Sequence, residues 1–331
     1  MTNNSQQYAI GIDIGGTNTK FGLVDHRGGI THQGSLSTAT FSTAEAFVYA
    51  LHAALLPAIN ELGIDAIKGV GIGAPNANYY NGCIELAPNL PWKGVVPLAA
   101  LVRERFGLPC SLTNDANAAA VGEMMYGAAR GMNDFIVITL GTGVGSGIVV
   151  GGRLVLGHDG FAGELGHTII RPGGRPHWSS GLVGSLEAYA SATGIALTGR
   201  EMREREGDNS LLHQFAAEAI DSKVVYDCAR KGDGAAQEVY RFTGQVLGEA
   251  LANFVMFSSP EAIILFGGVT KAGDLIMNPV REHLEKNLLP IFRKKVQLLF
   301  SELKEADAAI LGASALVWET KRESQYAEAN P

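Results

Sequence analysis

One short pattern occurs twice in this chain of 331 residues: an apolar strand, a glycine-rich turn and a second strand. The first copy spans residues 8–24, and the second spans residues 135–150, where the turn is one residue shorter. A run that passes from one strand through a glycine turn into another is typical of a hairpin. We interpret the two copies as an internal duplication. Because the chain also exceeds what one hydrophobic core usually organises, we expect two related domains.

Strands and helices alternate along the rest of the sequence. We expect further buried strands at residues 67–72, 111–113 and 262–269, and a capping box from Ser42 to Glu45 predicts the start of the first helix. This order indicates an α/β fold in which helices flank mixed sheets.

No linker rich in proline or serine marks a domain boundary, so we place it by the repeat. Residues 1–114 form the predicted N-terminal domain, and residues 115–307 form the predicted C-terminal domain. The last helix, residues 308–321, can pack back on the first domain.

The composition excludes several classes of protein. Lysine and arginine total 26 against 33 acidic residues, a net charge of −7, which argues against nucleic acid or an anionic membrane as the main partner. The three cysteines, Cys83, Cys110 and Cys228, are widely spaced and form neither a disulfide framework nor a metal knuckle. The first residues carry no targeting signal, and no apolar run approaches the roughly 18 residues of a membrane span. We therefore expect a cytoplasmic protein.

The two glycine turns can bind phosphate, because consecutive backbone N–H groups without a Cβ let a polyanion approach closely. Threonine hydroxyls and one lysine add donors, and a glycine pair ends the strand near residue 266. The candidate residues are Gly15, Gly16, Thr17, Asn18, Lys20, Gly141, Thr142, Gly143, Gly267 and Gly268. Either turn alone could be a plain hairpin, but the two copies together favour a phosphate clamp.

Asp13 stands immediately before the first turn and can serve a phosphate only through Mg²⁺, held directly or through water. Other phosphate folds are set aside. The sequence has no GxxxxGK[ST], and neither turn has GxGxxG spacing between a strand and a helix.

Four motifs make a family resemblance specific. Residues 13–22 resemble the first phosphate motif of sugar kinases in the superfamily of actin, hexokinase and heat-shock ATPases. Residues 114–119, the turn at 141–147 and the GELGH segment at 163–167 together resemble the ROK family, named for repressors, open reading frames and kinases. The similarity spans residues 8–317, with the motifs in the family's order. It implies two actin-like domains, related to ribonuclease H, with ATP and a sugar in the cleft between them.

Asp115 is the candidate general base. A carboxylate that takes the proton of an attacking hydroxyl contributes about 10² to 10⁴ in rate, and a helix start favours its ionised form. The alternative is that Asn114 or Asp115 merely caps the helix. Beside the phosphate turns and the family resemblance, we favour the catalytic role.

The resemblance also implies a set of sugar-binding residues. Glu164 and His167 are three apart, so they share one side of a helical turn, where carboxylate and imidazole can hold neighbouring hydroxyls. The full candidate set is Asn76, Asn89, Asn114, Asp115, Glu164, His167 and Glu187. Most family members carry glycine where Asn76 stands, and His167 could instead be a structural histidine.

One departure from the family concerns zinc. Many ROK proteins bind structural Zn²⁺ through a CxCGxxGCxE segment, but here the cysteine positions hold Trp178, Ser180 and Ser185, which cannot replace thiolates. His177 lies beside this loop, yet two imidazoles without thiolate or carboxylate support are weak evidence for a metal. We predict no zinc and a loop held by packing and hydrogen bonds.

These residues predict an ATP-dependent hexose kinase, most simply a glucokinase that phosphorylates the 6-hydroxyl of glucose. The alternatives are a kinase of N-acetylglucosamine or N-acetylmannosamine, or a fructokinase. A sugar-sensing transcriptional regulator is disfavoured, because only twelve residues precede Asp13 and no DNA-binding domain fits there. A nucleotide-driven interaction module would not need Glu164, His167 and Glu187. The expected partners are a hexose and ATP, with neither nucleic acid nor membrane, and the resemblance implies a homodimer.

Overall fold

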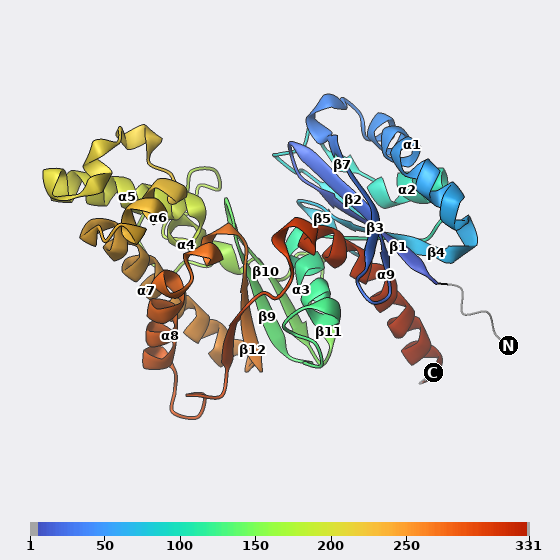
Figure 1. Cartoon of the computed structure of the whole chain (residues 1–331). Helices are drawn as coiled ribbons and strands as arrows, with labels where there is room; N and C mark the ends of the chain where they lie inside the picture. The colour runs from blue at the N-terminus through green and yellow to red at the C-terminus, as the bar shows by residue number, and fades with distance from the viewer. Residues whose placement is uncertain (1–5, 330–331) are drawn as a thin grey trace. The chain divides into compact units, whose positions relative to one another are not determined.

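The computed structural model describes residues 6–329 and consists of two compact units (Figure 1). The first unit contains the chain up to residue 132, residues 154–162 and the chain from residue 302 onward. The second unit contains residues 133–153 and 163–301. This division corrects the boundary that the sequence predicts after residue 114.

The reason for the correction is the packing of α3 (Asp115–Tyr126), which follows the predicted boundary but belongs to the first unit. Ala118 and Val121 of this helix share a buried apolar cluster with Ala315 and Leu316 of α9 (Glu305–Ala329). The two helices cover each other, so they cannot belong to different cores. The last helix is also longer than the predicted range of residues 308–321.

A five-stranded mixed sheet forms the centre of the first unit, with the strand order β3-β2-β1-β4-β8. Its strands are β1 (Tyr8–Ile14), β2 (Asn18–Asp25), β3 (Ile30–Ser37), β4 (Ile67–Gly73) and β8 (Cys110–Thr113). β1 runs antiparallel to β2 but parallel to β4, which is parallel to β8. The carboxyl ends of β1, β4 and β8 therefore meet at one edge of the sheet.

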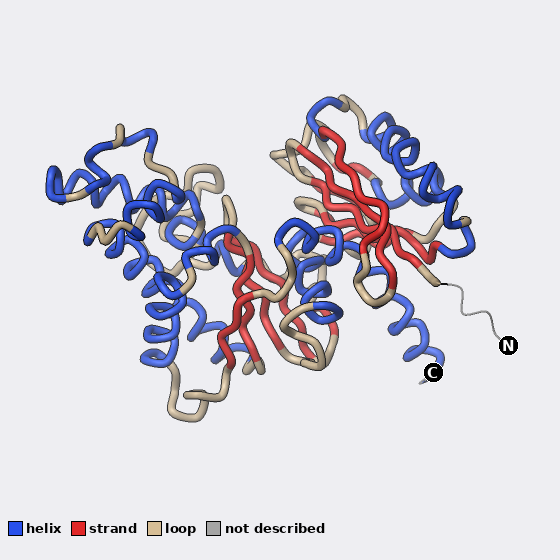
Figure 2. The backbone as a smooth tube through the Cα atoms, in the orientation of Figure 1, coloured by secondary structure: helices blue, strands red, loops and turns tan. Residues whose placement is uncertain are grey.

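The second unit contains a sheet of the same design, with the order β11-β10-β9-β12-β13 (Figure 2). Its strands are β9 (Phe135–Leu140), β10 (Val144–Val150), β11 (Arg153–Leu154), β12 (Ala262–Phe266) and β13 (Gln297–Phe300). Again a central strand pairs antiparallel with its hairpin partner and parallel with the next strand. The shared topology confirms the internal duplication.

The two faces of the first sheet are covered by different helices. Side chains of β1 that face one way, such as Ile10 and Ile12, pack in a core with Phe47 and Leu51 of α1 (Ala44–Leu62) and with α2 (Leu98–Phe106). Alternate residues face the other way, as strand geometry requires. On that face α9 crosses β1 and β4 (Figure 1).

Two glycines permit this crossing. A Cβ on Gly11 of β1 would overlap the carbonyl oxygen of Ile310, and one on Gly71 of β4 would overlap the carbonyl oxygen of Ala313. The backbone of α9 thus lies directly against the sheet. Any side chain at Gly11 or Gly71 would force the helix outward.

The second unit contains helices in addition to its sheet. They are α4 (Glu187–Ala190), α5 (Ala192–Glu206), α6 (Ser222–Arg230), α7 (Gly234–Ser258) and α8 (Asp274–Asn287).

A small sheet of β5 (Ala77–Asn78), β6 (Cys83–Glu85) and β7 (Val95–Val96) belongs to the first unit. The predicted α/β class, with helices flanking mixed sheets, is confirmed. Among the described helices, none has the length and apolar character that crossing a membrane requires.

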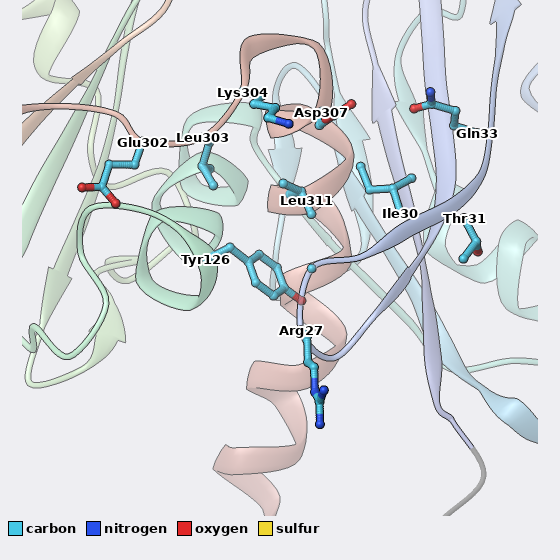
Figure 3. A pocket seen from close by; sticks show the side chains of 11 residues that line it. Arg27, Ile30, Thr31, Gln33, Tyr126, Glu302, Leu303, Lys304, Asp307 and Leu311 are labelled. Atoms are coloured by element: carbon cyan, nitrogen blue, oxygen red, sulfur yellow. The ribbon is translucent and has the colours of Figure 1, made fainter.

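A hollow of about 470 Å³ lies in the first unit, beside the β2–β3 turn and the start of α9 (Figure 3). Arg27, Tyr126, Lys304 and Asp307 contribute to its wall. None of the residues that the sequence predicts for phosphate or sugar binding lines it. The candidate site is therefore built elsewhere, at the edges of the two large sheets.

Candidate active site

Asp13 is the last residue but one of β1, at the edge where the carboxyl ends of the parallel strands of the first unit meet. Lys20 of β2 lies opposite it in the strand register, and Gly73 of β4 lies opposite on the other side. Burial, followed by the charge of Asp115, raises the pKa of Asp13 to about 6, whereas Lys20 lowers it. A carboxylate whose charge is disfavoured in this way gains when a cation binds beside it. Its oxygen donors also suit Mg²⁺.

Asp115 follows the end of β8 at the same edge. A Cβ built on Gly73 would lie 3.6 Å from the Cα of Asp115 and 3.8 Å from Oδ1 of Asp13, so the two acidic residues flank one point of β4. The protein around the Asp115 carboxyl displaces water and raises its pKa, while the backbone N–H groups of Ala116 and Asp115 lower it. Asp115 as a whole residue is nevertheless exposed to solvent. It therefore combines raised basicity with access for a substrate.

Asn114, and not Asp115, caps α3. Its Oδ1 accepts a 2.6 Å hydrogen bond from the backbone N–H of Asn117, while Oδ1 of Asp115 accepts one of 2.8 Å from Ala116. The capping alternative raised by the sequence thus applies to Asn114. Asp115 stands one residue inside the helix and keeps an oxygen for other partners.

The first glycine turn lies beside these carboxyl groups. The N–H of Gly15 donates to the carbonyl of Asn18 over 3.0 Å, which closes the β1–β2 hairpin. A Cβ on Gly16 would come within 2.5 Å of the carbonyl oxygen of Asn89, so the turn packs against the loop that carries Asn89. Thr17, Asn18 and Lys20 are exposed. The structure therefore brings Asp13, the turn, Asn89 and Asp115 to one edge of the first sheet.

Asn76 has a structural role that the sequence did not reveal. Its φ of 50° lies in the left-handed region, which favours glycine and tolerates asparagine. This explains how asparagine can stand where family members carry glycine. Its Nδ2 donates over 3.0 Å to the carbonyl of Glu85, which ties the turn after β4 to β6.

The second glycine turn occupies the matching place in the second unit. Residues 141–143 join β9 to β10, and Gly267 follows β12, the parallel neighbour of β9. A Cβ on Gly267 would lie 2.6 Å from the carbonyl oxygen of Leu140, so the turn and the glycine pair are adjacent. By contrast, a Cβ on Gly141 or Gly268 would meet no described atom within 4 Å. This open backbone is a cradle that a phosphate can fill.

Glu164 and His167 share one short turn, as their spacing predicts. The 3-10 helix η3 (Leu165–His167) brings Nε2 of His167 to 3.8 Å from Oε2 of Glu164. Gly166 lies against the carbonyl of Val144, which seats this turn on β10. Among the described residues, Nδ1 of His167 is buried without a hydrogen-bond partner.

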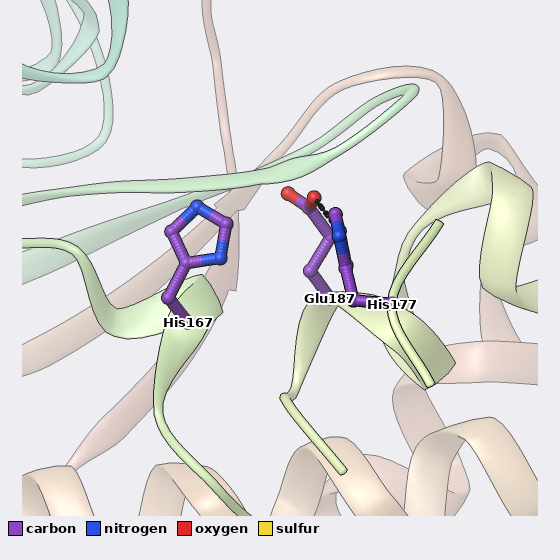
Figure 4. A group of neighbouring side chains, drawn as sticks. All are labelled: His167, His177 and Glu187. Carbon is purple, nitrogen blue, oxygen red and sulfur yellow. Dashed lines mark hydrogen bonds and ion pairs between the residues drawn. The ribbon is translucent and has the colours of Figure 1, made fainter. Parts of the chain in front are cut away.

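Glu187 begins α4 and is held at both carboxylate oxygens. Oε2 accepts a 2.7 Å hydrogen bond from the backbone N–H of Val144, directly after the second glycine turn. Oε1 lies 2.5 Å from Nε2 of His177 (Figure 4). His167, His177 and Glu187 thus form a group whose potential ligand atoms all lie within 4.8 Å. The sequence alone did not show that Glu187 lies beside both histidines, and the structure places it there.

The loop that replaces the family's cysteine segment is held by hydrogen bonds. Isolated bridges pair Ile169 with Ser185 and Pro176 with Val183. Arg175 donates to the carbonyls of Ala188 and Gly194 and to the carboxylate of Glu201. These contacts attach the loop to α4 and α5 without any cysteine.

Comparison with known proteins identifies the family that carries this arrangement. Residues 9–320 match the model of the ROK family. The chain belongs to the ROK family. It is 36% identical to a glucokinase of Thermotoga maritima over 94% of this chain and 97% of that protein. A solved ROK family glucokinase from Streptomyces griseus, in complex with glucose and AMPPNP, is 34% identical and matches with a TM-score of 0.77, covering 94% of this chain and 99% of that one.

Not every relative of this chain is named as a kinase. A putative xylose repressor of Caldicellulosiruptor is 30% identical over 93% of this chain and 77% of the repressor. The fold that the ROK chain shares with solved sugar kinases is the actin-like one that the resemblance implied. Family membership establishes the fold, and glucokinases that are 34–36% identical over nearly the whole chain support a hexose kinase.

Sequence reasoning missed two parts of the ROK site. The backbone N–H of Val144, which binds Glu187, leaves no trace in a side-chain motif. The sequence indicated His177 only as a weak candidate for a metal ligand. It lies ten residues before Glu187, in the loop that leads into α4. A histidine directly before the first of the family's cysteine positions was the available signal.

Proposed function

We propose that this ROK protein is an ATP-dependent hexose kinase that transfers the γ-phosphoryl group of ATP to the 6-hydroxyl of glucose. The observation that carries the proposal is the pair Asp13 and Asp115 beside a glycine turn, with Asp115 accessible to solvent. Its similarity to glucokinases over nearly the whole chain supports glucose as the acceptor.

In this proposal Asp115 takes the proton of the 6-hydroxyl as the new bond to phosphorus forms. Asn89, Asn114, Glu164, His167 and Glu187 bind the other hydroxyl groups, since carboxylate, amide and imidazole groups can each hold one. The raised pKa of Asp115 makes it a stronger base than an ordinary aspartate, as general base catalysis at neutral pH favours. Asn76 contributes by shaping its turn.

The phosphate groups of ATP are assigned to the glycine turns of both units and to Gly267 and Gly268. The open space above Gly141 and Gly268 fits them, because no Cβ blocks the backbone N–H groups there. Asp13 fits Mg²⁺, which when bound neutralises the developing negative charge on the phosphates. Lys20, opposite Asp13, adds a further positive charge at the same edge.

The remaining expectations belong to the same proposal. We infer that the protein needs no zinc, lies in the cytoplasm, forms a homodimer and binds no nucleic acid. The three cysteines, all free, fit a reducing compartment. Sedimentation of the purified chain tests the dimer, and a DNA shift assay at low salt tests the regulator alternative suggested by the repressor relative.

The decisive experiment measures ADP release with glucose, mannose, fructose, N-acetylglucosamine and N-acetylmannosamine. We expect glucose to give the highest kcat/KM, and polyphosphate in place of ATP tests the donor. Asp115→Asn should lower kcat by about 10² to 10⁴ while glucose binding stays measurable by calorimetry. Turnover that no sugar stimulates would contradict the proposal.

A further inference from the structure

His177 is a buried residue in an exposed loop. Its side chain is 1% exposed, whereas its neighbours Trp178, Ser179 and Ser180 are exposed. The ring stacks on Trp178 at a centroid distance of 4.1 Å and touches the edge of His167 at 5.7 Å. Every polar atom of such a buried ring must find a partner, and both nitrogens do.

The hydrogen bonds define which nitrogen carries the proton. Nδ1 faces the backbone N–H groups of Ser179 at 3.2 Å and Ser180 at 3.0 Å. Since both groups are donors, Nδ1 must accept with its lone pair. The neutral ring therefore carries its proton on Nε2, which donates it to Oε1 of Glu187.

The position of the proton on His177 decides whether a metal or a proton lies between His167, His177 and Glu187. The ligand atoms of His167, His177 and Glu187 are close enough to share an ion. A metal on Nε2 of His177 would, however, displace the proton while both backbone N–H groups still occupy Nδ1. That would demand an imidazolate ring. The observed geometry fits a proton shared with Glu187.

Glu187 is thereby fixed from two directions. Its Oε1 is held by the loop through His177, and its Oε2 by β10 through the N–H of Val144. Each oxygen keeps a further lone pair, so the carboxylate can still accept a hydroxyl hydrogen bond. With two anchors its orientation is set before a substrate arrives.

We propose that His177 is a positioning residue that orients Glu187 for hexose binding and does so with a proton, without a metal. The inference rests on the proposed function for its substrate. In the proposed function Glu187 binds a hydroxyl group of the hexose and takes no proton, so loss of His177 should weaken hexose binding more than it slows phosphoryl transfer.

The kinetic test compares three variants. His177→Leu removes all three hydrogen bonds of the ring, and we expect the KM for glucose to rise about 10- to 100-fold, as when a group that orients a ligand-binding residue is lost, with a smaller change in kcat. His177→Gln keeps an amide donor and should recover part of the affinity. His26→Leu makes the same change at an exposed histidine of the β2–β3 turn and should match the wild type.

Two outcomes of these kinetics would overturn the inference. One is an unchanged KM in a folded His177→Leu protein. The other is equal impairment of the Leu and Gln variants, which would indicate loss of packing only. A wild-type enzyme without sugar-dependent turnover would contradict the proposed function instead, so the two failures are distinguishable.

A second measurement needs no activity. In the wild-type protein labelled with ¹⁵N-histidine, the resonances that disappear in His177→Gln should show a proton on Nε2 and none on Nδ1. Elemental analysis of the same purified sample should find no stoichiometric zinc. The opposite tautomer, or one bound zinc per chain, would overturn the inference.

Discussion

At the residue scale, the two acidic residues at the edge of the first sheet combine function with a cost in stability. Asp13 and Asp115 flank Gly73, and burial raises the pKa of both carboxyl groups. A carboxyl group whose charged form is disfavoured gains when a cation binds beside it, as proposed for Asp13. It also accepts a proton more readily, as proposed for Asp115. The same feature makes the folded state sensitive to pH.

The sign of this sensitivity follows from proton linkage. The folded-state pKa of Asp13, about 6, exceeds its unfolded value of 3.8, so the folded protein binds the proton more tightly. The contribution of this group to stability is thus full at pH below about 4 and is lost as the pH rises through 6. Asp13→Asn should therefore raise the melting temperature at pH 8 without Mg²⁺, by a few degrees.

Thermal melts of wild type and Asp13→Asn between pH 4 and pH 8 check this prediction. The difference should shrink toward pH 4, where Asp13 is protonated in the folded state. Lys68→Gln is a suitable control, because this half-buried lysine donates to the nearby carbonyl of Asp65 and takes no part in the candidate site. If the difference in melting temperature between wild type and Asp13→Asn stays constant across the pH range, the charge of Asp13 does not cause that difference.

At the scale of elements, local sequence patterns predicted most strands and helices but not the tertiary contacts through which these elements pack. The apolar run predicts β9 at residues 135–140, as observed, since a buried strand has no competing pattern. The first helix begins one residue later than the capping box indicates, because Thr43 caps it in place of Ser42. β3 and β13 lie at sheet edges and carry weaker patterns, so the sequence did not reveal them.

The crossing of α9 over the first sheet predicts an unusually sensitive glycine. Gly71→Ala places a methyl group on the carbonyl of Ala313, and backbone on both sides cannot yield as a side chain can. We expect a loss of about 1 to 3 kcal/mol in the free energy of unfolding, as for other overpacked cores.

Urea unfolding at constant pH measures this loss. Gly234→Ala at the start of α7 is the control, because a Cβ there meets no described atom and alanine favours a helix. Equal stability of Gly71→Ala and the wild type would mean that α9 does not press on β4.

At the scale of the whole molecule, the duplication was readable because both hairpins keep their glycine turns. The boundary was not, because it depends on α3 and α9 covering each other across almost 200 residues of sequence. The candidate site shows the same limit. Side-chain motifs identified Asp115, Glu164 and Glu187, whereas the backbone donor at Val144 and the proton on His177 required three-dimensional contacts.

Removal of α9 should therefore act on one unit only. A chain that ends at Ser301 loses the buried side chains of Ile310 and Leu316, about 3 to 6 kcal/mol of apolar burial. Hydrogen exchange should then show at least about 100-fold lower amide protection in β1 and β4 than in the full chain. β9 and β12 serve as the internal reference, and equal loss in both sheets would contradict the prediction.

The position of α9 also imposes an order on biosynthesis. A ribosome releases the strands of the first sheet early, but the helix that lies on Gly11 and Gly71 is made last. Every residue of the second unit emerges before that helix does. During synthesis, one apolar face of the amino-terminal sheet therefore stays uncovered until α9 has been made. The second unit can fold before that. We expect chaperones to bind this uncovered face during translation.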